Sequence, residues 1–380
     1  MRVYLDNAAT TPLDKEVFDA MAPFMLEHFG NPSSIHWHGR QVRAAIEGAR
    51  RTVATLLNAS PSEIFFTSCG TEADNTAIIS TSRSLGIRHA ITTRMEHHAV
   101  LHSVECLAKT DGVTVHYLNH DEKGTLDLNH LEELLATNPR CLVSVMHANN
   151  EIGNLNDIQA IGEICKKYDA IFHSDTVQTM GHYRHDLKTL PINFLVGSGH
   201  KFHGPKGIGF LYVDGSQKIQ PFIHGGSQER NMRGGTENVY GIVGLAKAME
   251  IAYRDMEAHH QHIQGLKDRM IARLKEQMDD VRFNGNSEFA EKSLYTVLNV
   301  SLPPSEMNEM LLFNLDINKI SASGGSACTS GANSGSHVLQ ALGADPNRGA
   351  VRFSFSKYNT AEEIDYAATT LAKMYQNVPA

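Results

Sequence analysis

A lysine in a turn between two apolar runs is the residue whose position most strongly suggests chemistry. Lys201 follows the apolar run 193–199 and precedes a glycine-rich connection into the run 208–213. Such runs predict strands, and the small residues around the turn let another group approach the backbone closely. Most lysines point into water. A lysine can instead form a Schiff base once burial or a nearby cation lowers its pKa. Taken alone, Lys201 leaves both interpretations open.

Small and polar residues after two other predicted strands could contact a flat anionic ligand. Gly70 and Thr71 link a strand at 64–67 to a helix, so the free N–H groups of that turn could bind a phosphate. A plain capping turn is the more common outcome. His97 follows the next strand and is either an ordinary loop residue or an aromatic ring stacked on a cofactor. Neither motif is decisive by itself.

Amide and carboxylate side chains follow two further strands. Asn150 lies in a run rich in amide groups, and Asp175 follows the apolar run 170–173, with Gln178 three residues later. An aspartate in this position is costly to keep ionised without a partner. A protonated pyridine nitrogen would be such a partner, and the carboxylate would in turn keep that nitrogen protonated. A capping aspartate is the simpler alternative.

One cofactor explains all of these residues together. A phosphate cradle, a stacking ring, an acid for a pyridinium and a Schiff-base lysine all follow predicted strands, and a chance coincidence of the four is rare. Pyridoxal 5′-phosphate (PLP) needs each of these groups. The sequence therefore predicts a PLP site.

A thiol and an arginine in the second half of the chain suggest the reaction. Cys328 lies in the small, polar segment 321–336, which predicts a loop with no apolar neighbour to bury the sulfur. Arg352, on a predicted strand, is either a surface residue or a bidentate clamp for a substrate carboxylate. Three other thiols lie in apolar periodic runs and are expected in the core: Cys106, Cys141 and Cys165.

Alternating strands and helices must position these groups. From residue 64 to residue 175 predicted strands alternate with helices, which implies an α/β fold with a mostly parallel sheet covered on both faces. Ligands bind beyond the carboxyl ends of the strands in such sheets. Residues 239–278 are helical by period, with a bend expected near His259. Strands at 295–301 and 351–356, with helices near 305–315, 334–342 and 361–375, predict a smaller α+β region.

The composition is that of an ordinary globular protein. The chain has 380 residues, 41% of them apolar and 20% charged, which is enough for two domains. Its net charge of −8 gives no reason to expect nucleic acid or an anionic membrane as a partner. No run reaches the roughly 18 apolar residues of a transmembrane helix. The five cysteines lack the paired spacing of metal or redox motifs, so no metal is expected and the cytoplasm is the expected compartment.

Almost the whole chain resembles the cysteine desulfurases of the NifS/IscS type, which belong to the PLP-dependent aspartate-aminotransferase superfamily (fold type I). The resemblance rests on the runs 4–11, 149–153 and 175–178, on His200 with Lys201, and on the segment around Cys328. It implies an N-terminal arm over 1–14 that joins the small domain. It also implies a large PLP-binding domain over 15–255 and a small C-terminal domain over 256–380, which carries Cys328.

The resemblance also implies roles for the residues around the cofactor. Lys201 would hold PLP as a Schiff base and move protons. Asp175 would pair with the pyridine nitrogen and Gln178 with the phenolic oxygen, and His97 would stack on the ring and take part in proton transfer. The other contacts with the cofactor would come from Gly70, Thr71, Asn150, Ser198 and His200.

The remaining implied roles concern the substrate and the partners. Asn150 and Arg352 would hold the carboxylate of L-cysteine, and Cys328 would take its sulfur as a persulfide, which leaves L-alanine. Thr236 of the partner subunit would complete the phosphate site, so an obligate homodimer with shared active sites is implied. A sulfur-acceptor protein would receive the sulfur for iron–sulfur clusters, another cofactor or tRNA. The tail after Arg352 is short beside relatives that dock a scaffold there, so the acceptor is left open.

Three other functions fit part of the pattern. A selenocysteine lyase or C–S lyase would share the fold but need not store sulfur on a thiol such as Cys328. An aminotransferase needs no cysteine nucleophile. A non-catalytic sulfur carrier would not need Lys201 and Asp175, which are both present.

Overall fold

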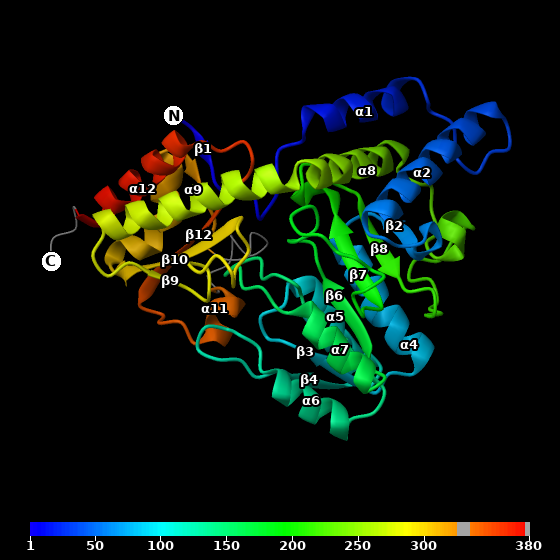
Figure 1. The fold of residues 1–380 in the computed structure, drawn as a ribbon, viewed down its shortest axis with the longest axis horizontal. Coiled ribbons are helices and arrows are strands. Elements are labelled where there is room, and N and C mark those ends of the chain that lie inside the picture. Colours follow the sequence, from blue (N-terminus) through cyan, green and yellow to red (C-terminus); the bar gives the residue numbers. More distant parts are fainter. Residues whose placement is uncertain (325–334, 377–380) are drawn as a thin grey trace.

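The seven-stranded sheet in the larger of two lobes is built from strands that the sequence predicts (Figure 1). The computed structural model describes residues 1–324 and 335–376. The strands are β2 (Ile64–Thr67), β3 (His89–Thr92), β4 (Thr114–Tyr117), β5 (Cys141–Ser144), β6 (Ile171–Asp175), β7 (Phe194–Ser198) and β8 (Gly209–Val213). Their order is β2-β8-β7-β6-β5-β3-β4, and every neighbouring pair is parallel except the two pairs that contain β8. The prediction of a mostly parallel α/β sheet is confirmed.

Helices cover this sheet because its strands are apolar on both faces. β5, β7 and β8 are buried along their whole length, as expected for strands between two helical layers. The helices are α1 (Lys15–Leu26), α2 (Trp37–Leu56), α3 (Gly70–Asn75), α4 (Thr81–Leu85), α5 (His98–Thr110), α6 (Leu128–Thr137), α7 (Ile158–Lys167) and α8 (Val239–Arg254). The helix predicted after β2 is interrupted by a π-helical turn, Thr76–Ser80, between α3 and α4.

The long helical run predicted over 239–278 divides at Asp255. α8 ends at Arg254 and α9 (Met256–Gln277) begins two residues later, so the break at Asp255 lies four residues before the bend expected near His259. Asp255 has a backbone outside the helical region, with φ −106° and ψ 12°. Its carboxylate pairs with the side chain of Arg254 at 2.7 Å. The break therefore lies where a short-range ion pair and a cap form, and no proline or glycine marks it.

The smaller lobe forms around a three-stranded antiparallel sheet. β10 (Val297–Pro304) lies between β9 (Arg282–Phe283) and β12 (Arg348–Ser354). β10 and β12 lie within two or three residues of the predicted positions, whereas β9 was not predicted. α9 packs against α12 (Ala361–Gln376) beside this sheet (Figure 1). The other helices of the lobe are α10 (Leu311–Ile317) and α11 (His337–Leu342).

The N-terminal segment belongs to the smaller lobe through a pairing that the sequence did not predict. β1 (Val3–Tyr4) pairs in parallel with β11 (Ile320–Ser321). Both strands have two residues, too few for a periodic pattern. After β1 the chain passes to α1 in the larger lobe, so residues 5–14 connect the two lobes. The division into domains at residue 255 stays a prediction.

Candidate active site

A cavity of about 190 Å³ at the carboxyl ends of the parallel strands brings nine of the predicted site residues together. Each of the nine ends or follows β2, β3, β5, β6 or β7, so these strands deliver their side chains to one edge of the sheet. They are Gly70, Thr71, His97, Asn150, Asp175, Gln178, Ser198, His200 and Lys201. The cavity is also lined by Cys69, which precedes Gly70 in the predicted turn, and by four residues that the sequence interpretation did not place there: Ala9, Asp74, Met146 and Val177.

Lys201 contacts the backbone of the N-terminal segment. It closes a 3-10 turn after β7, and its Nζ donates to the carbonyl oxygens of Ala8 (2.6 Å) and Ala9 (3.0 Å). The side-chain amide of Gln178 donates to the same Ala8 oxygen at 3.1 Å. Tyr4 orders this segment, because its hydroxyl donates to the Thr10 carbonyl at 2.8 Å. Residues of the small lobe's arm therefore form one wall of the cavity.

Asp175 is a buried carboxyl that needs a cationic partner to be ionised. It ends β6, and its Oδ1 accepts the N–H of Val177 at 2.9 Å. Burial raises the pKa of Asp175, and the charge of Lys201 opposes this shift. Burial likewise raises the pKa of Glu96 to about 8 and that of Asp74 well above its usual range, with repulsion from Asp175 adding to both. A protonated ring nitrogen at Asp175 would relieve this excess of buried carboxyl groups.

His97 is held as a neutral ring. It is the N-cap of α5, and its Nδ1 accepts the N–H of Ala99 at 3.2 Å. Nδ1 is thus an acceptor, which places the ring proton on Nε2. Burial and then the charge of Lys201 lower the pKa of His97 to about 4. A neutral imidazole with a proton on Nε2 can stack on a flat ring and exchange that proton.

The opposite end of the cavity suits a phosphate. Gly70 begins α3, and a Cβ there would lie 2.8 Å from the Val177 side chain, so only glycine leaves the space open. The Oγ of Ser198 is buried and has no hydrogen-bond partner among the described residues. A phosphate oxygen would accept its proton, and the first N–H groups of α3 favour an anion. The residues present therefore fit PLP.

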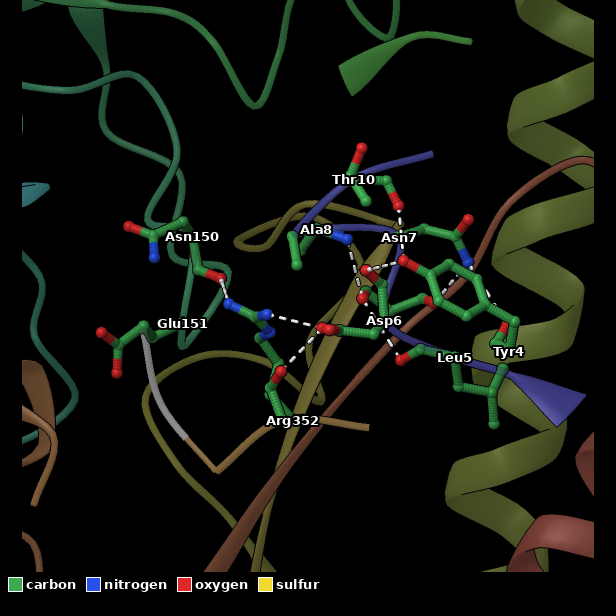
Figure 2. A network of polar contacts seen from close by, with 12 residues as sticks. Tyr4, Leu5, Asp6, Asn7, Ala8, Thr10, Asn150, Glu151 and Arg352 are labelled. Atoms are coloured by element: carbon green, nitrogen blue, oxygen red, sulfur yellow. Dashed lines mark hydrogen bonds and ion pairs between the residues drawn. The ribbon is translucent and has the colours of Figure 1, made fainter. Parts of the chain in front are cut away.

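Arg352 reaches the wall of the cavity from the smaller lobe (Figure 2). It lies on β12, and its side chain is 1% exposed. Nη1 donates to the backbone oxygen of Asn150 at 2.9 Å, and Nη2 donates to Asp6 Oδ1 at 2.8 Å. Asn150 lines the cavity, and its side-chain Oδ1 is buried without a partner in the described part of the chain. Arg352 and Asn150 are thus adjacent, as the resemblance implies.

Two predicted residues, Thr236 and Arg352, do not line this cavity, and one expectation for a thiol is wrong. Thr236 lines a separate cavity of about 120 Å³ together with Ser68 and Arg233. Cys328 lies in 325–334, outside the described residues. Cys141 and Cys165 are buried as expected, but Cys106 is half-exposed because it lies beside the buried face of α5.

Sequence reasoning missed two carboxylates. Asp74 lies four residues after Gly70, so it shares a helix face with the start of α3, and this spacing was a usable signal. Asp6 binds Arg352 across 346 residues of sequence, and nothing local predicts that contact.

Comparison with known proteins agrees with the fold and shows the family. The family model for aminotransferase class V matches residues 3–367. The chain is 43% identical over 380 residues to "Cysteine desulfurase IscS" of Dictyoglomus turgidum, covering 99% of this chain and 95% of that protein. It is 43% identical over 381 residues to "Cysteine desulfurase" of Trichormus azollae, covering 100% and 94%.

Solved structures of similar proteins indicate the same family. A "NifS-like protein" matches with a TM-score of 0.91 and 38% identity, covering 100% of both chains. "SspA in complex with cysteine" matches with a TM-score of 0.81 and 32% identity, covering 95% of this chain and 100% of that one. The chain therefore belongs to the class-V aminotransferase family, whose members are PLP enzymes. Within this family the chain belongs to the IscS/NifS-type cysteine desulfurases.

The described residues contain neither a metal-binding cluster nor a membrane-spanning helix. Within residues 1–324 and 335–376 no cluster of three or more histidine, cysteine, aspartate or glutamate side chains could hold a metal ion. In the same residues no helix has the length and apolar character needed to cross a bilayer.

Proposed function

We propose that the protein is a PLP-dependent cysteine desulfurase that converts L-cysteine to L-alanine and carries the sulfur as a persulfide on Cys328. The observation that carries this proposal is the cavity in which Lys201, Asp175 and His97 meet a phosphate cradle. The chain's full-length similarity to cysteine desulfurases, and the cysteine bound by one structural relative, support the substrate.

The cofactor and this chain's residues divide the work. Bound PLP supplies the electron sink that makes the Cα–H of an amino acid acidic. Lys201 Nζ is the amine that holds the cofactor and then moves a proton at the substrate Cα. The Asp175 carboxylate holds the proton on the ring nitrogen, and Gln178 donates a hydrogen bond at the phenolic oxygen. His97 covers the ring and exchanges the proton on its Nε2.

The substrate is oriented by its carboxylate. Arg352 offers a rigid, planar set of donors that matches a carboxylate. Asn150 lies next to it, joined by the 2.9 Å hydrogen bond from Nη1. This anchors the amino acid between the two lobes for attack on its sulfur by the Cys328 thiolate. The S–S bond of the persulfide forms as the Cβ–S bond of the substrate breaks, and the electron pair left at Cβ is protonated. The enzyme's bases return the proton abstracted from Cα, and the proton lost by the substrate thiol supplies the new C–H bond at Cβ. Alanine leaves, and a reductant or an acceptor protein removes the persulfide sulfur.

The proposed enzyme is a homodimer that shares its active sites. The region of α1, α2 and the turn between them exposes large apolar side chains, which include Leu26 (80% exposed), Phe29 (75%) and Ile35 (92%). These helices lie at the outer edge of the larger lobe (Figure 1). Apolar patches of this kind mark interfaces. Thr236 of the partner subunit would then complete the phosphate site. The cytoplasm and an iron–sulfur or other sulfur-acceptor protein remain the expected compartment and partner.

One stoichiometric assay tests the function. The protein loaded with PLP is mixed with L-cysteine and a thiol reductant, and alanine and sulfide are measured together. We expect equal amounts of both, lost in Lys201→Ala and in Cys328→Ser, while Cys328→Ser keeps the cofactor absorbance. Cys106→Ser, at a half-exposed thiol on α5, is the matched control. Full sulfide release by Cys328→Ser would indicate a lyase, and keto acid without sulfide would indicate an aminotransferase.

A further inference from the structure

The network around Arg352 contains a carboxylate that the proposed reaction does not use (Figure 2). Asp6 Oδ1 accepts a hydrogen bond from Arg352 Nη2 at 2.8 Å and another from the hydroxyl of Ser323 at 2.8 Å. The backbone fixes Asp6 in place, since it forms a bridge with Ser354 at the end of β12. The N–H of Leu5, one residue earlier, donates to the Ser321 oxygen at 2.9 Å. Asp6 is therefore a rigidly placed acceptor.

The guanidinium of Arg352 depends on Asp6 for its charge balance. Arg352 is 1% exposed, and Asp6 is its ion-pair partner at 2.8 Å, with the Asp6 side chain 19% exposed. Nη1 is taken by the neutral backbone oxygen of Asn150. Nε is buried and makes no hydrogen bond to the residues that the structure describes. The Arg352 guanidinium therefore has one anionic partner and one N–H without a hydrogen bond in the described chain, so it can bind a second carboxylate.

Glu151 is a second carboxylate next to this network, but Asp6 is the one that competes for the Arg352 guanidinium. Glu151 is fully buried beside Asn150, and its Oε2 accepts a hydrogen bond from the Ser336 hydroxyl. The ion pair of Arg352 is with Asp6. A ligand carboxylate on Arg352 would thus lie within a few ångströms of the Asp6 charge.

We propose that Asp6 is a positioning residue that holds Arg352 in its binding orientation and competes with the α-carboxylate of the substrate for that guanidinium. The proposal rests on the proposed function, in which Arg352 binds the substrate carboxylate. Before substrate arrives, Asp6 balances the buried charge and preorganises the donors. After it arrives, two carboxylates share one guanidinium, and their repulsion weakens substrate binding.

Asp6→Asn separates these two effects because it keeps an acceptor oxygen and removes the charge. The ligands are 3-mercaptopropionate, which has a carboxylate and a thiol but no amine, and cysteamine, which has an amine and a thiol but no carboxylate. We expect the Kd of the PLP-loaded protein for 3-mercaptopropionate to fall about tenfold in Asp6→Asn, as loss of one like-charge contact implies. The affinity for cysteamine should change less than twofold.

Asp19→Asn is the matched control, since it removes one negative charge from an exposed position on α1 where Asp19 pairs with Lys15. It should leave both affinities unchanged. Unchanged or weaker binding of 3-mercaptopropionate in Asp6→Asn would overturn the proposal, as would equal tightening in Asp19→Asn. If wild-type protein released no sulfide from L-cysteine, the proposed function would fail, while the comparison of carboxylate affinities would still judge the role of Asp6.

A stability measurement distinguishes this role from a purely structural one. Without ligand, the Tm of Asp6→Asn should fall, because a buried arginine loses its ionic partner. Saturating 3-mercaptopropionate should then raise the Tm more than it does in the wild-type protein, since the ligand replaces the missing charge. Asp6→Ser supplies a second neutral acceptor if Asp6→Asn aggregates. A lowered Tm without a larger ligand-induced rise would overturn the proposal.

Discussion

The cofactor cavity and the Arg352 network hold polar groups in opposite ways. In the cavity, the Ser198 hydroxyl and the Asn150 side-chain oxygen are buried without partners in the described chain, and burial raises the pKa of Asp175. In the Arg352 network, the charge of the guanidinium is already balanced by Asp6, and Nη1 donates to a backbone oxygen, although Nε has no partner in the described chain. Unpaired buried groups are costly, so the cavity gains the most when a ligand supplies partners.

This difference matches two kinds of ligand. A cofactor that stays bound benefits from groups that nothing in the protein satisfies. A substrate that must bind and leave at each turnover benefits from a site whose donors are already ordered and whose affinity is moderated. The Asp6 carboxylate supplies this moderation within the chain, whereas no equivalent anion fills the phosphate cradle in the residues that the structure describes. Mutations in the cavity should therefore change the affinity for PLP, and mutations in the Arg352 network should change the KM for L-cysteine.

The largest effect is expected from Arg352→Gln, which should raise the KM for L-cysteine on the order of 10²-fold. Loss of one partner from a buried, hydrogen-bonded charge pair costs roughly 2–5 kcal/mol. The affinity for PLP should change little, because Arg352 does not line the cofactor cavity. Steady-state kinetics and the cofactor absorbance measure the two quantities.

Arg269→Gln is the control for Arg352→Gln, since Arg269 is an exposed arginine on α9 that pairs with Asp365. An Arg352→Gln variant that lost PLP while it retained its KM would contradict the separation of the two regions.

Ser198→Ala is expected to have a smaller effect, which is confined to the affinity for PLP. The substitution removes a hydrogen bond to a charged ligand group, so the Kd for PLP should rise about tenfold. The Tm of the cofactor-free protein should stay the same or rise, because the removed hydroxyl has no partner there. Titration of the cofactor-free protein with PLP and a thermal melt test both parts.

Ser174→Ala provides a matched control for Ser198→Ala. Ser174 lies on the neighbouring strand β6, and its hydroxyl is also buried and unpaired among the described residues, but it does not line the cavity. Its substitution should leave the affinity for PLP unchanged. Equal losses of affinity in both variants would mean that the Ser198 hydroxyl does not contact the phosphate.

The two regions also differ in how far the sequence predicts them. The strand and helix pattern delivers Lys201, Asp175 and His97 to one edge of a parallel sheet, so their convergence follows from periodicity alone. The Asp6–Arg352 pair depends on β1 and β11, two-residue strands that carry no periodic signal. The sequence could therefore predict the cofactor cavity but not the placement of the carboxylate next to the substrate arginine.

Other differences have equally local causes. The break at Asp255 is a local change of backbone angles, where the Asp255 N–H caps α8 on the Ile251 oxygen, and it does not interrupt the apolar pattern of the sequence. Cys106 lies in an apolar run but at the edge of the buried face of α5, and periodicity does not locate such edges to one residue.

The smallest expected effect is on the pH dependence of stability, through the buried neutral histidines of the larger lobe. His185 is 3% exposed, and burial lowers its pKa to about 3. An unfolded histidine takes up a proton near pH 6.5, while the folded one stays neutral until about pH 3. The neutral ring therefore stabilises the folded state above pH 6.5, and this contribution to the free energy of unfolding is lost as the pH falls from 6.5 toward 3. Since Glu96, with a pKa of about 8, acts in the opposite direction, the wild-type slope alone does not isolate the contribution of His185.

His185→Gln isolates this contribution. Between pH 6 and pH 5, the free energy of unfolding of the variant should fall less steeply than that of the wild-type protein, by up to about 1.4 kcal/mol per pH unit. Urea unfolding at pH 7.5, 6 and 5 measures the slopes, with His224→Gln, at an exposed loop position, as the control. Equal slopes in wild type and His185→Gln would mean that the folded ring carries a proton. The neutral state inferred for the partly buried His97 would then lose support, because the same cause, burial, lowers the pKa of both rings.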